Sequence, residues 1–159
     1  MFKGGPAWWV KIGDFGISKR VEGSTALRTM QVGTRGYVAP EVIGIFCPDD
    51  TTTTAQDLTY TMAVDIWALG EITFRMITCQ PSFTEPRFLY DYVVKKAAFP
   101  LQALTGSQAS PGCCDLIQRM MKASPNDRIR VEGAWRHTWL QAHEFIDEEE
   151  TSSDSKYIS

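Results

Sequence analysis

The chain has 159 residues, 43% of them hydrophobic, and a formal net charge of −3. This length suits one domain, and the hydrophobic content is sufficient for a buried core. The charge is unevenly distributed, because five acidic residues and one lysine give residues 147–159 a charge of −4, while residues 1–146 carry 15 basic and 14 acidic side chains. A nearly neutral body predicts neither a nucleic-acid-binding surface nor a strongly anionic partner.

The four cysteines lack the spacing of a metal site, since no Cys-x-x-Cys pair and no paired histidine ligands accompany them. Adjacent Cys113 and Cys114 are interpreted as small helix residues in a reduced compartment. No run of 18 apolar residues occurs, and the N-terminus lacks the features of a signal peptide. We therefore expect a cytoplasmic or nuclear protein that does not bind or cross a membrane.

The first predicted element is a short strand over residues 8–12, where aromatic and β-branched residues precede a glycine-bounded turn at 13–16. Residues 19–36 have no sustained hydrophobic period and are rich in Gly, Ser and Thr, which predicts a loop. A brief helical turn is expected after Pro40. Residues 47–58 are polar and low in complexity, which is typical of a surface segment.

The rest of the chain predicts helices. The longest covers residues 61–78, with apolar side chains almost all the way round, which indicates a helix buried on most of its faces. Further helices are expected over 87–96 and 113–122, the latter with Ser110 as N-cap and Pro111 as its first residue. A last helix follows Arg130, with Val131, Ala134 and Trp135 on one side. The acidic, serine-rich residues 147–159 are expected to be a disordered tail. The fold class is therefore mainly α with one short β element.

Four motifs occur in a meaningful order: Asp14-Phe15-Gly16, then Gly33-Thr34-Arg35-Gly36-Tyr37-Val38-Ala39-Pro40-Glu41, Asp65-Ile66-Trp67-Ala68-Leu69-Gly70 and Pro125-Asn126-Asp127-Arg128. A single tripeptide would be weak support, but four in sequence are specific. From about Trp8 to Leu140 the chain resembles the C-terminal lobe of a eukaryotic protein kinase of the serine/threonine type. The resemblance implies a partial kinase domain over 1–146, with 47–58 as an insertion.

The resemblance implies a nucleotide-binding role for Asp14, Phe15 and Gly16. Asp14 would ligate the Mg²⁺ that bridges the phosphates of ATP, a role that suits a hard oxygen anion. The alternative is an ordinary aspartate in a turn. Phe15 would pack under this site, or simply serve as a core aromatic residue.

The following loop is implied to face a protein substrate through Gly33, Thr34 and Tyr37. Thr34 occupies the position that contacts the catalytic aspartate of the family and supports catalysis. Thr29, Thr25 and Ser24 are the candidates for activating phosphorylation, in that order, because phosphate there would order the loop against arginines. The alternative is a solvated polar loop without a regulatory role.

Other matching positions are implied to be structural. Glu41 and Arg128 are expected to form an ion pair, in which a guanidinium binds the carboxylate in bidentate fashion. Asp65 would be buried against the catalytic loop in the family; without that loop in this sequence, it would face water or another donor. Trp67 and Gly70, like Tyr37, match packing positions. His137 and His143 lack a catalytic spacing, and His137 is expected to be structural.

Several parts that phosphoryl transfer requires are missing from this sequence, namely a glycine-rich loop, a strand lysine, a catalytic-loop aspartate and an asparagine for a second Mg²⁺. We therefore expect the 159-residue chain to lack kinase activity and to bind magnesium nucleotide poorly. Two hypotheses remain open: a truncated form of an active serine/threonine kinase whose coding sequence begins upstream, or a non-catalytic fragment that binds proteins or competes for substrates. Because the upstream helix and catalytic loop of the family are missing from this sequence, the helix at 61–78 should expose an apolar patch. Another chain could cover this patch, the fragment could be prone to aggregation, or the protein could begin further upstream.

Overall fold

The computed structural model describes residues 11, 13, 36–48 and 62–141. These residues are mainly helical and contain no β strand, which confirms the predicted mainly α class. Most of the predicted strand at 8–12, of the turn at 13–16, of the loop at 19–36 and of the segment at 47–58 lies outside the described residues, as does the acidic tail. Those predictions therefore stay predictions.

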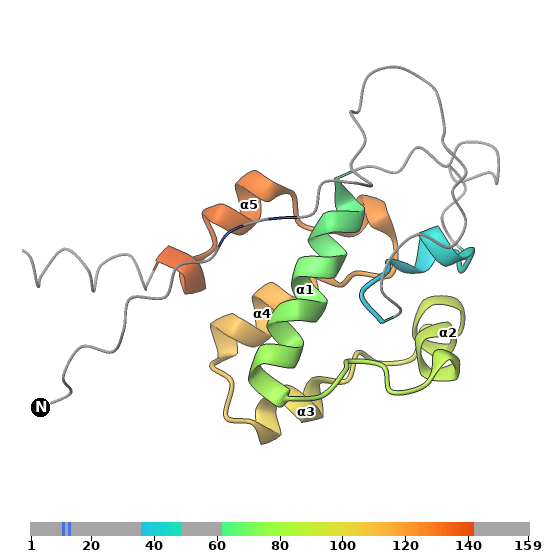
Figure 1. Ribbon diagram of the computed structural model, residues 1–159, viewed down its shortest axis with the longest axis horizontal. Coiled ribbons are helices and arrows are strands. Elements are labelled where there is room, and N and C mark those ends of the chain that lie inside the picture. The colour runs from blue at the N-terminus through green and yellow to red at the C-terminus, as the bar shows by residue number, and fades with distance from the viewer. Residues whose placement is uncertain (1–10, 12, 14–35, 49–61, 142–159) are drawn as a thin grey trace, which may run out of the picture.

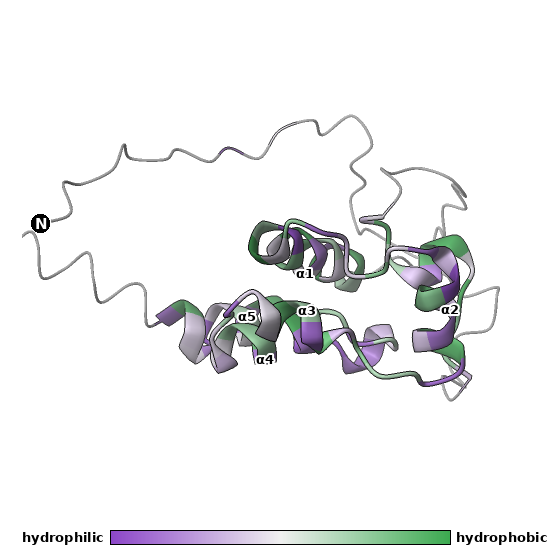
Figure 2. Ribbon diagram, turned by 90° about the horizontal axis from the view of Figure 1, so that it is seen from below, coloured by the Kyte–Doolittle hydropathy of each residue, from purple (hydrophilic) through white to green (hydrophobic). Residues whose placement is uncertain are grey.

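The helices form two layers. Helix α1 (Ala63–Thr78) packs across α4 (Pro111–Met120) and α3 (Leu101–Gly106), and α3 and α4 also contact each other. Figure 2 shows α1 on one side and α3, α4 and α5 (Val131–Trp135) on the other. Helix α2 (Pro86–Val94) lies at one end of both layers (Figure 1). Two short 3-10 turns, η2 (Pro40–Ile43) and η3 (Pro125–Asp127), complete the described elements.

Helix α1 is the predicted longest helix, and it ends at Cys79, whose left-handed backbone lets its N–H donate to the Arg75 carbonyl at 2.8 Å. One face of α1 is buried in the core, with Ile66, Trp67 and Phe74 on it. The prediction that most faces are buried is wrong, because Leu69, Ile72 and Met76 are 48%, 43% and 78% exposed. The predicted apolar patch is therefore present on α1.

Helix α4 begins as its sequence predicts. Ser110 accepts a hydrogen bond from the Cys113 N–H at 3.2 Å, and Pro111 occupies the first helical position. The buried face of α4 then turns toward α1, with Leu116, Ile117 and Met120 at most 2% exposed. This layer fixes the position of the chain that follows it, including Arg128.

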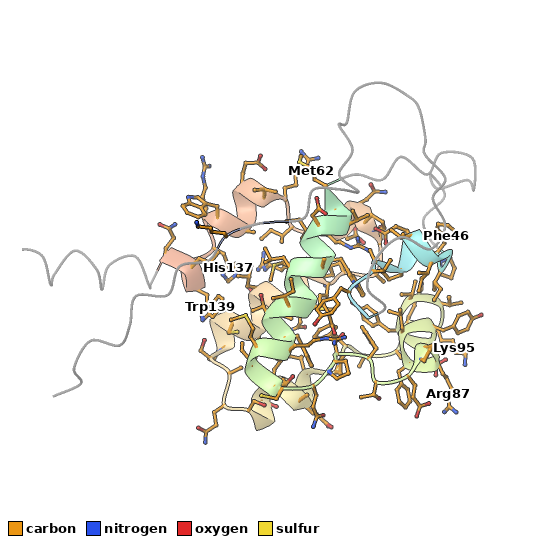
Figure 3. All side chains as sticks on the ribbon, in the orientation of Figure 1. Phe46, Met62, Arg87, Lys95, His137 and Trp139 are labelled. Atoms are coloured by element: carbon orange, nitrogen blue, oxygen red, sulfur yellow. The ribbon has the colours of Figure 1, made fainter. Side chains whose placement is uncertain are left out.

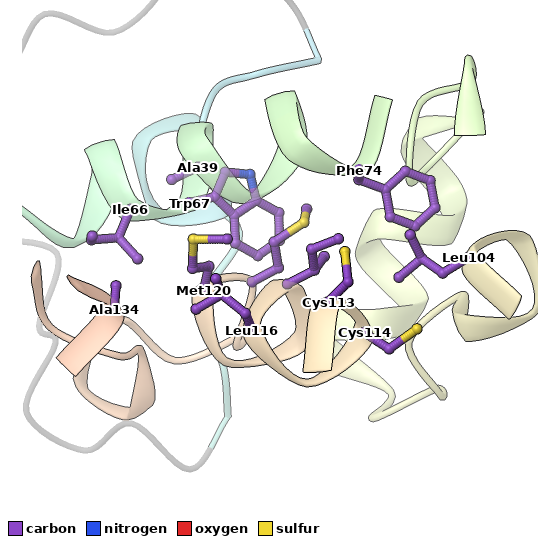
Figure 4. Packing of buried hydrophobic residues seen from close by; sticks show 12 residues of the cluster. Ala39, Ile66, Trp67, Phe74, Leu104, Cys113, Cys114, Leu116, Met120 and Ala134 are labelled. Atoms are coloured by element: carbon purple, nitrogen blue, oxygen red, sulfur yellow. The ribbon is translucent and has the colours of Figure 1, made fainter. Parts of the chain in front are cut away.

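The core lies between the two layers. Trp67 of α1 and Met120 of α4 meet near its centre, and Phe74 faces Leu104 of α3 (Figure 4). A group of aromatic rings extends the core toward α2, with Phe83 stacked on Trp67 at 6.3 Å between centroids and 5.2 Å from Tyr92. Burial raises the pKa of Tyr92 to about 12, and its hydroxyl donates to the Met121 carbonyl at 2.8 Å.

The remaining predictions are partly confirmed. The helical turn after Pro40 is η2, and the helix predicted at 87–96 is α2, which ends at Val94 because Lys96 adopts a left-handed conformation with φ 56°. Helix α5 follows Arg130 as predicted, with Val131, Ala134 and Trp135 spaced along one side of it; of these, Ala134 is buried, while Val131 and Trp135 are 49% and 64% exposed. Helix α3 and the turn η3 were not predicted.

Candidate functional site

The predicted site residues divide into two groups. Those at the N-terminal side lie outside the described residues: Asp14, Phe15, Gly16, Ser24, Thr25, Thr29, Gly33 and Thr34. Those in the helical body are described: Tyr37, Glu41, Asp65, Trp67, Gly70 and Arg128. The described part of the candidate site is therefore the segment 36–48 together with the helical body that holds it.

Glu41 and Arg128 form the expected ion pair. Nη1 and Nη2 of Arg128 donate to Oε1 and Oε2 of Glu41 at 2.6 and 2.7 Å, a bidentate contact that ties η2 to the chain after η3. The Arg128 side chain is 0% exposed, and it also donates to the backbone carbonyls of Lys122, Ala63 and Ala123. The buried guanidinium thus has partners from three separate parts of the chain.

Trp67 and Gly70 place this pair against α1. The guanidinium carbon of Arg128 lies 5.0 Å from the centroid of the Trp67 ring, within the range of a cation–π interaction. At Gly70, an added Cβ would lie only 2.6 Å from Cγ of Met121 and 3.1 Å from Cβ of Met120. Gly70 is therefore the residue that allows α1 to approach the end of α4 closely.

Asp65 is not buried in the described part of the chain. It lies in the first turn of α1, where a carboxylate interacts favourably with the helix dipole, and it is exposed to solvent. The burial that the family resemblance implies is thus not found, and the alternative in which Asp65 faces water describes this structure.

A second polar network, centred on Glu71 and Arg75 of α1, was not predicted. The Arg75 Nε donates to Glu71 Oε1 at 2.6 Å, and its Nη2 donates to the Gly36 carbonyl at 3.2 Å. The guanidinium carbon also lies 4.3 Å from the centroid of the Tyr37 ring. The hydrogen bond that Arg75 donates to Glu71 raises the pKa of Arg75. The only sequence signal was the i, i+4 spacing of opposite charges on a helix.

Glu71 is 2% exposed, and its carboxylate is satisfied from a second direction by Ser82. The Ser82 N–H donates to Oε1 at 3.3 Å, and the Ser82 hydroxyl donates to Oε2. These donors satisfy both oxygens of the buried carboxylate, which would otherwise be costly to bury. The network therefore connects Gly36 and Tyr37 to α1 and to the turn that follows it.

The segment after α5 docks on α4 (Figure 3). His137 Nε2 lies 2.9 Å from Asp115 Oδ2, and the same oxygen accepts from the Arg119 Nε at 2.9 Å. The hydrogen bond to His137, with a further one from Arg119, lowers the pKa of Asp115 below its usual range. Trp139 packs close to Gly112, where an added Cβ would lie 3.3 Å from Trp139 Cβ. The expected structural role of His137 agrees with these contacts.

A candidate metal centre is not found in the described part of the chain. Among the described residues, no three His, Cys, Asp or Glu side chains gather closely enough to hold a metal ion. Cys113 and Cys114 are 2% and 7% exposed, and burial raises the pKa of Cys113, while Cys79 is exposed. No helix in the described part of the chain has both the length and the apolar content needed to cross a membrane.

Comparison with known proteins adds the following similarities. Residues 2–140 match the family described as the protein kinase domain. The chain is 32% identical over 132 residues to serine/threonine-protein kinase cds1 of Schizosaccharomyces pombe, covering 82% of this chain and 27% of that protein.

Two further relatives come from an animal and a plant. The SNF-related serine/threonine-protein kinase of Rattus norvegicus is 33% identical over 132 residues, covering 83% of this chain and 16% of that protein. The mitogen-activated protein kinase homolog MMK2 of Medicago sativa is 29% identical over 168 residues, covering 88% and 42%. The chain thus spans less than half the length of these three relatives.

Proposed function

Because the chain belongs to the protein kinase family, and to its serine/threonine type, we propose that it provides the lobe of a serine/threonine kinase that holds the protein substrate. The reaction of such an enzyme transfers the terminal phosphoryl group of ATP to a serine or threonine hydroxyl. This lobe would present residues 33–37 to the substrate and carry Asp14 as a ligand of Mg²⁺.

The observation that carries this proposal is the fastening of residues 36–41 to the helical body. Glu41 is held by Arg128 at one end of this segment, and Gly36 and Tyr37 are held by Arg75 at the other. A loop that receives a substrate needs such a rigid base, because binding energy is lost when the binding surface must be ordered first. The proposed roles of the other predicted loop residues follow from the chemistry of their side chains. Thr34 supports the acceptor hydroxyl, and phosphate on Thr29, Thr25 or Ser24 adds negative charge to the loop.

The ATP and Mg²⁺ chemistry rests on Asp14 alone in this sequence. A single carboxylate does not position a nucleotide, and the described residues add no metal-ligating cluster. We therefore propose that the 159-residue chain by itself does not transfer phosphate. A transfer assay with labelled ATP and a mixed Ser/Thr peptide substrate tests this directly. Activity above background that disappears in Asp14→Ala would show the proposal of inactivity to be incorrect.

The kinase function itself is tested in a chimera. The part of this chain that aligns with the cds1 kinase over 132 residues would replace the matching part of that kinase, so that the rest of that kinase completes the enzyme. We expect phosphorylation of Ser and Thr but not Tyr peptides, with loss of activity in Asp14→Ala. A chimera that is folded and binds ATP, yet transfers no phosphate to any peptide, would refute the proposed function.

A second candidate is a non-catalytic module that binds another protein chain. The observation in its favour is the exposed apolar face of α1 formed by Leu69, Ile72 and Met76. The occupant would be a polypeptide that presents apolar side chains to this face. Ile72→Glu should then abolish complex formation with that partner without unfolding the chain, whereas Gln102→Glu, at an exposed position of α3 outside the patch, should not. A complex that survives Ile72→Glu would exclude this surface as the interface.

We propose a cytoplasmic or nuclear location, supported by four cysteines that form no disulfide with one another. Fluorescence microscopy of the tagged chain tests it, and a secreted or vesicular signal would contradict it.

A further inference from the structure

Arg75 is the one arginine of α1, and it reaches across to the segment that leads out of the predicted substrate-facing loop. Its Nη2 holds the Gly36 carbonyl at 3.2 Å, and its guanidinium carbon lies 4.3 Å from the centroid of the Tyr37 ring. Hydrogen bonding through one edge and stacking through the face is a combination that a lysine ammonium does not reproduce. Arg75 thus contacts both residues of the Gly36-Tyr37 step at once.

The backbone at Gly36 is shaped for this contact. Gly36 has φ +94°, a conformation that side chains disfavour, and an added Cβ would lie 2.6 Å from Nη2 of Arg75. Any other residue at this position would meet both the strained backbone and the guanidinium. The close approach of Arg75 and the choice of glycine at 36 therefore depend on each other.

Glu71 and Ser82 fix the position of the Arg75 side chain through a chain of hydrogen bonds. Glu71 is almost completely buried, accepts from the Arg75 Nε at 2.6 Å, and is itself bound by the backbone N–H and hydroxyl of Ser82. The orientation of the guanidinium is consequently fixed by the core side of α1. Arg75 itself remains partly exposed, with 29% of its side chain accessible.

We infer that Arg75 is a positioning residue for the protein substrate, acting through Tyr37 and the Gly36 carbonyl. The inference rests on the proposed function, because residues 33–37 face a substrate only if the chain forms the substrate-holding lobe of a kinase. Loss of Arg75 should release the Gly36-Tyr37 step from α1 while η2 stays anchored through Glu41 and Arg128. The segment 36–41 would then keep its attachment at Glu41 and lose the one at Gly36 and Tyr37.

The experiment compares four variants of the full 159-residue chain. Arg75→Gln removes the stacking and shortens the reach to Gly36, and Arg75→Lys keeps only the charge. The pair Glu71→Gln with Arg75→Gln removes the buried unpaired carboxylate that Arg75→Gln alone would leave, so that folding and positioning are separated. Arg119→Gln is the matched control, since Arg119 also pairs with an acid four residues away but on the surface of α4.

The first measurement is amide hydrogen exchange of residues 36–39, which requires no kinase function. We expect exchange to be about tenfold faster in Arg75→Gln and in the double variant, since each loses the stacking and the hydrogen bond. Exchange in α4 should be unchanged, and Arg119→Gln should resemble the wild-type chain at residues 36–39. Unchanged exchange at 36–39 in a folded Arg75→Gln chain would overturn the inference, whatever the chain binds.

The second measurement is binding to an immobilised library of peptides with a fixed central Ser or Thr. We expect affinity to fall about tenfold in Arg75→Gln and the double variant, and Arg75→Lys not to restore it. Thermal unfolding of the double variant near that of the wild type would exclude a merely structural effect. If the wild-type chain binds peptide and the folded double variant binds it with the same affinity, the positioning role of Arg75 is refuted. The substrate-holding function of the lobe would not be affected by that result. A wild-type chain that binds no peptide would refute the substrate-holding function of the lobe and the inference with it.

Discussion

Glu41 and Arg128 are separated by 87 residues in the sequence, yet their side chains meet through two parallel hydrogen bonds of 2.6 and 2.7 Å. The pair is buried, and the guanidinium is further held by three backbone carbonyls and the face of Trp67. The carboxylate of Glu41 and the guanidinium of Arg128 each balance the charge of the other. Removal of either one leaves an unpaired buried charge in the core.

Arg128→Met should therefore destabilise the chain strongly, by about 3 to 5 kcal/mol, because Glu41 would remain buried without its partner. Arg128→Lys should cost less, about 1 to 3 kcal/mol, since an ammonium keeps the charge but loses the bidentate geometry. Urea unfolding measures both values. Arg119→Met, which removes a solvent-exposed pair with Asp115, should cost less than about 1 kcal/mol. Equal costs for Arg128→Met and Arg119→Met would contradict the buried role.

Gly70→Ala should destabilise the packing of α1 on α4, even though alanine favours helix formation. The new methyl group would overlap with Cγ of Met121, a fully buried side chain, and crowd Cβ of Met120. Overpacking of this kind costs about 1 to 3 kcal/mol, against which the helix propensity of alanine offsets roughly 1 kcal/mol. The matched control is Gly106→Ala in α3, where nothing lies within 4 Å of an added Cβ. Calorimetry should show a lower Tm for Gly70→Ala and an unchanged or higher one for Gly106→Ala.

Asp115 should contribute to stability at neutral pH and lose that contribution in acid. Its pKa in the folded chain is lowered by His137 and then Arg119, so protons bind more readily to the unfolded chain. The contribution is complete above the ordinary carboxyl pKa of about 3.9 and disappears as the pH falls through the lower folded value. Asp115→Asn should therefore be less stable than the wild type at pH 7, with the difference shrinking in strong acid. A difference that stays constant between those conditions would argue against the ion pair.

The ionisation of Tyr92 should lower the free energy of unfolding at high pH. Its folded pKa of about 12 lies above the ordinary value of 10.0, because burial disfavours the phenolate. Its contribution is therefore complete below pH 10 and is lost as the pH rises toward 12. Tyr92→Phe should remove this dependence, at a cost near neutral pH of about 1 kcal/mol for the lost hydrogen bond to Met121. Ultraviolet titration should show one fewer late-ionising tyrosine in the variant; exposed Tyr90→Phe serves as the control.

The parts of the fold that depend on local chemistry were predictable from the sequence. Ser110 and Pro111 mark the start of α4, and the turn after Pro40 follows its proline, because capping and φ restriction act within a few residues. Helix α3 was missed because Leu101–Gly106 is a short element with few periodic positions. Its place is decided by Leu104, which is fully buried against the rest of the core.

The candidate site divides in the same way. The Glu41–Arg128 pair followed from a family resemblance, whereas no local pattern brings those two residues together. The contacts of Arg75 with Gly36 and Tyr37 were not predicted, because a contact across 39 residues depends on how α1 packs. Periodicity also failed to show which faces of α1 are covered, since Ile72 and Phe74 are equally apolar in sequence but only Phe74 is buried.

The distribution of thiols has a practical consequence. Cys113 and Cys114 lie in the interface between the two helical layers, whereas Cys79 is exposed at the end of α1. A thiol reagent should therefore modify Cys79 rapidly in the native chain, and reach the adjacent pair only when the layers separate. With Cys79 and Cys47 replaced by serine, the labelling rate of the remaining two cysteines would measure how often this interface opens.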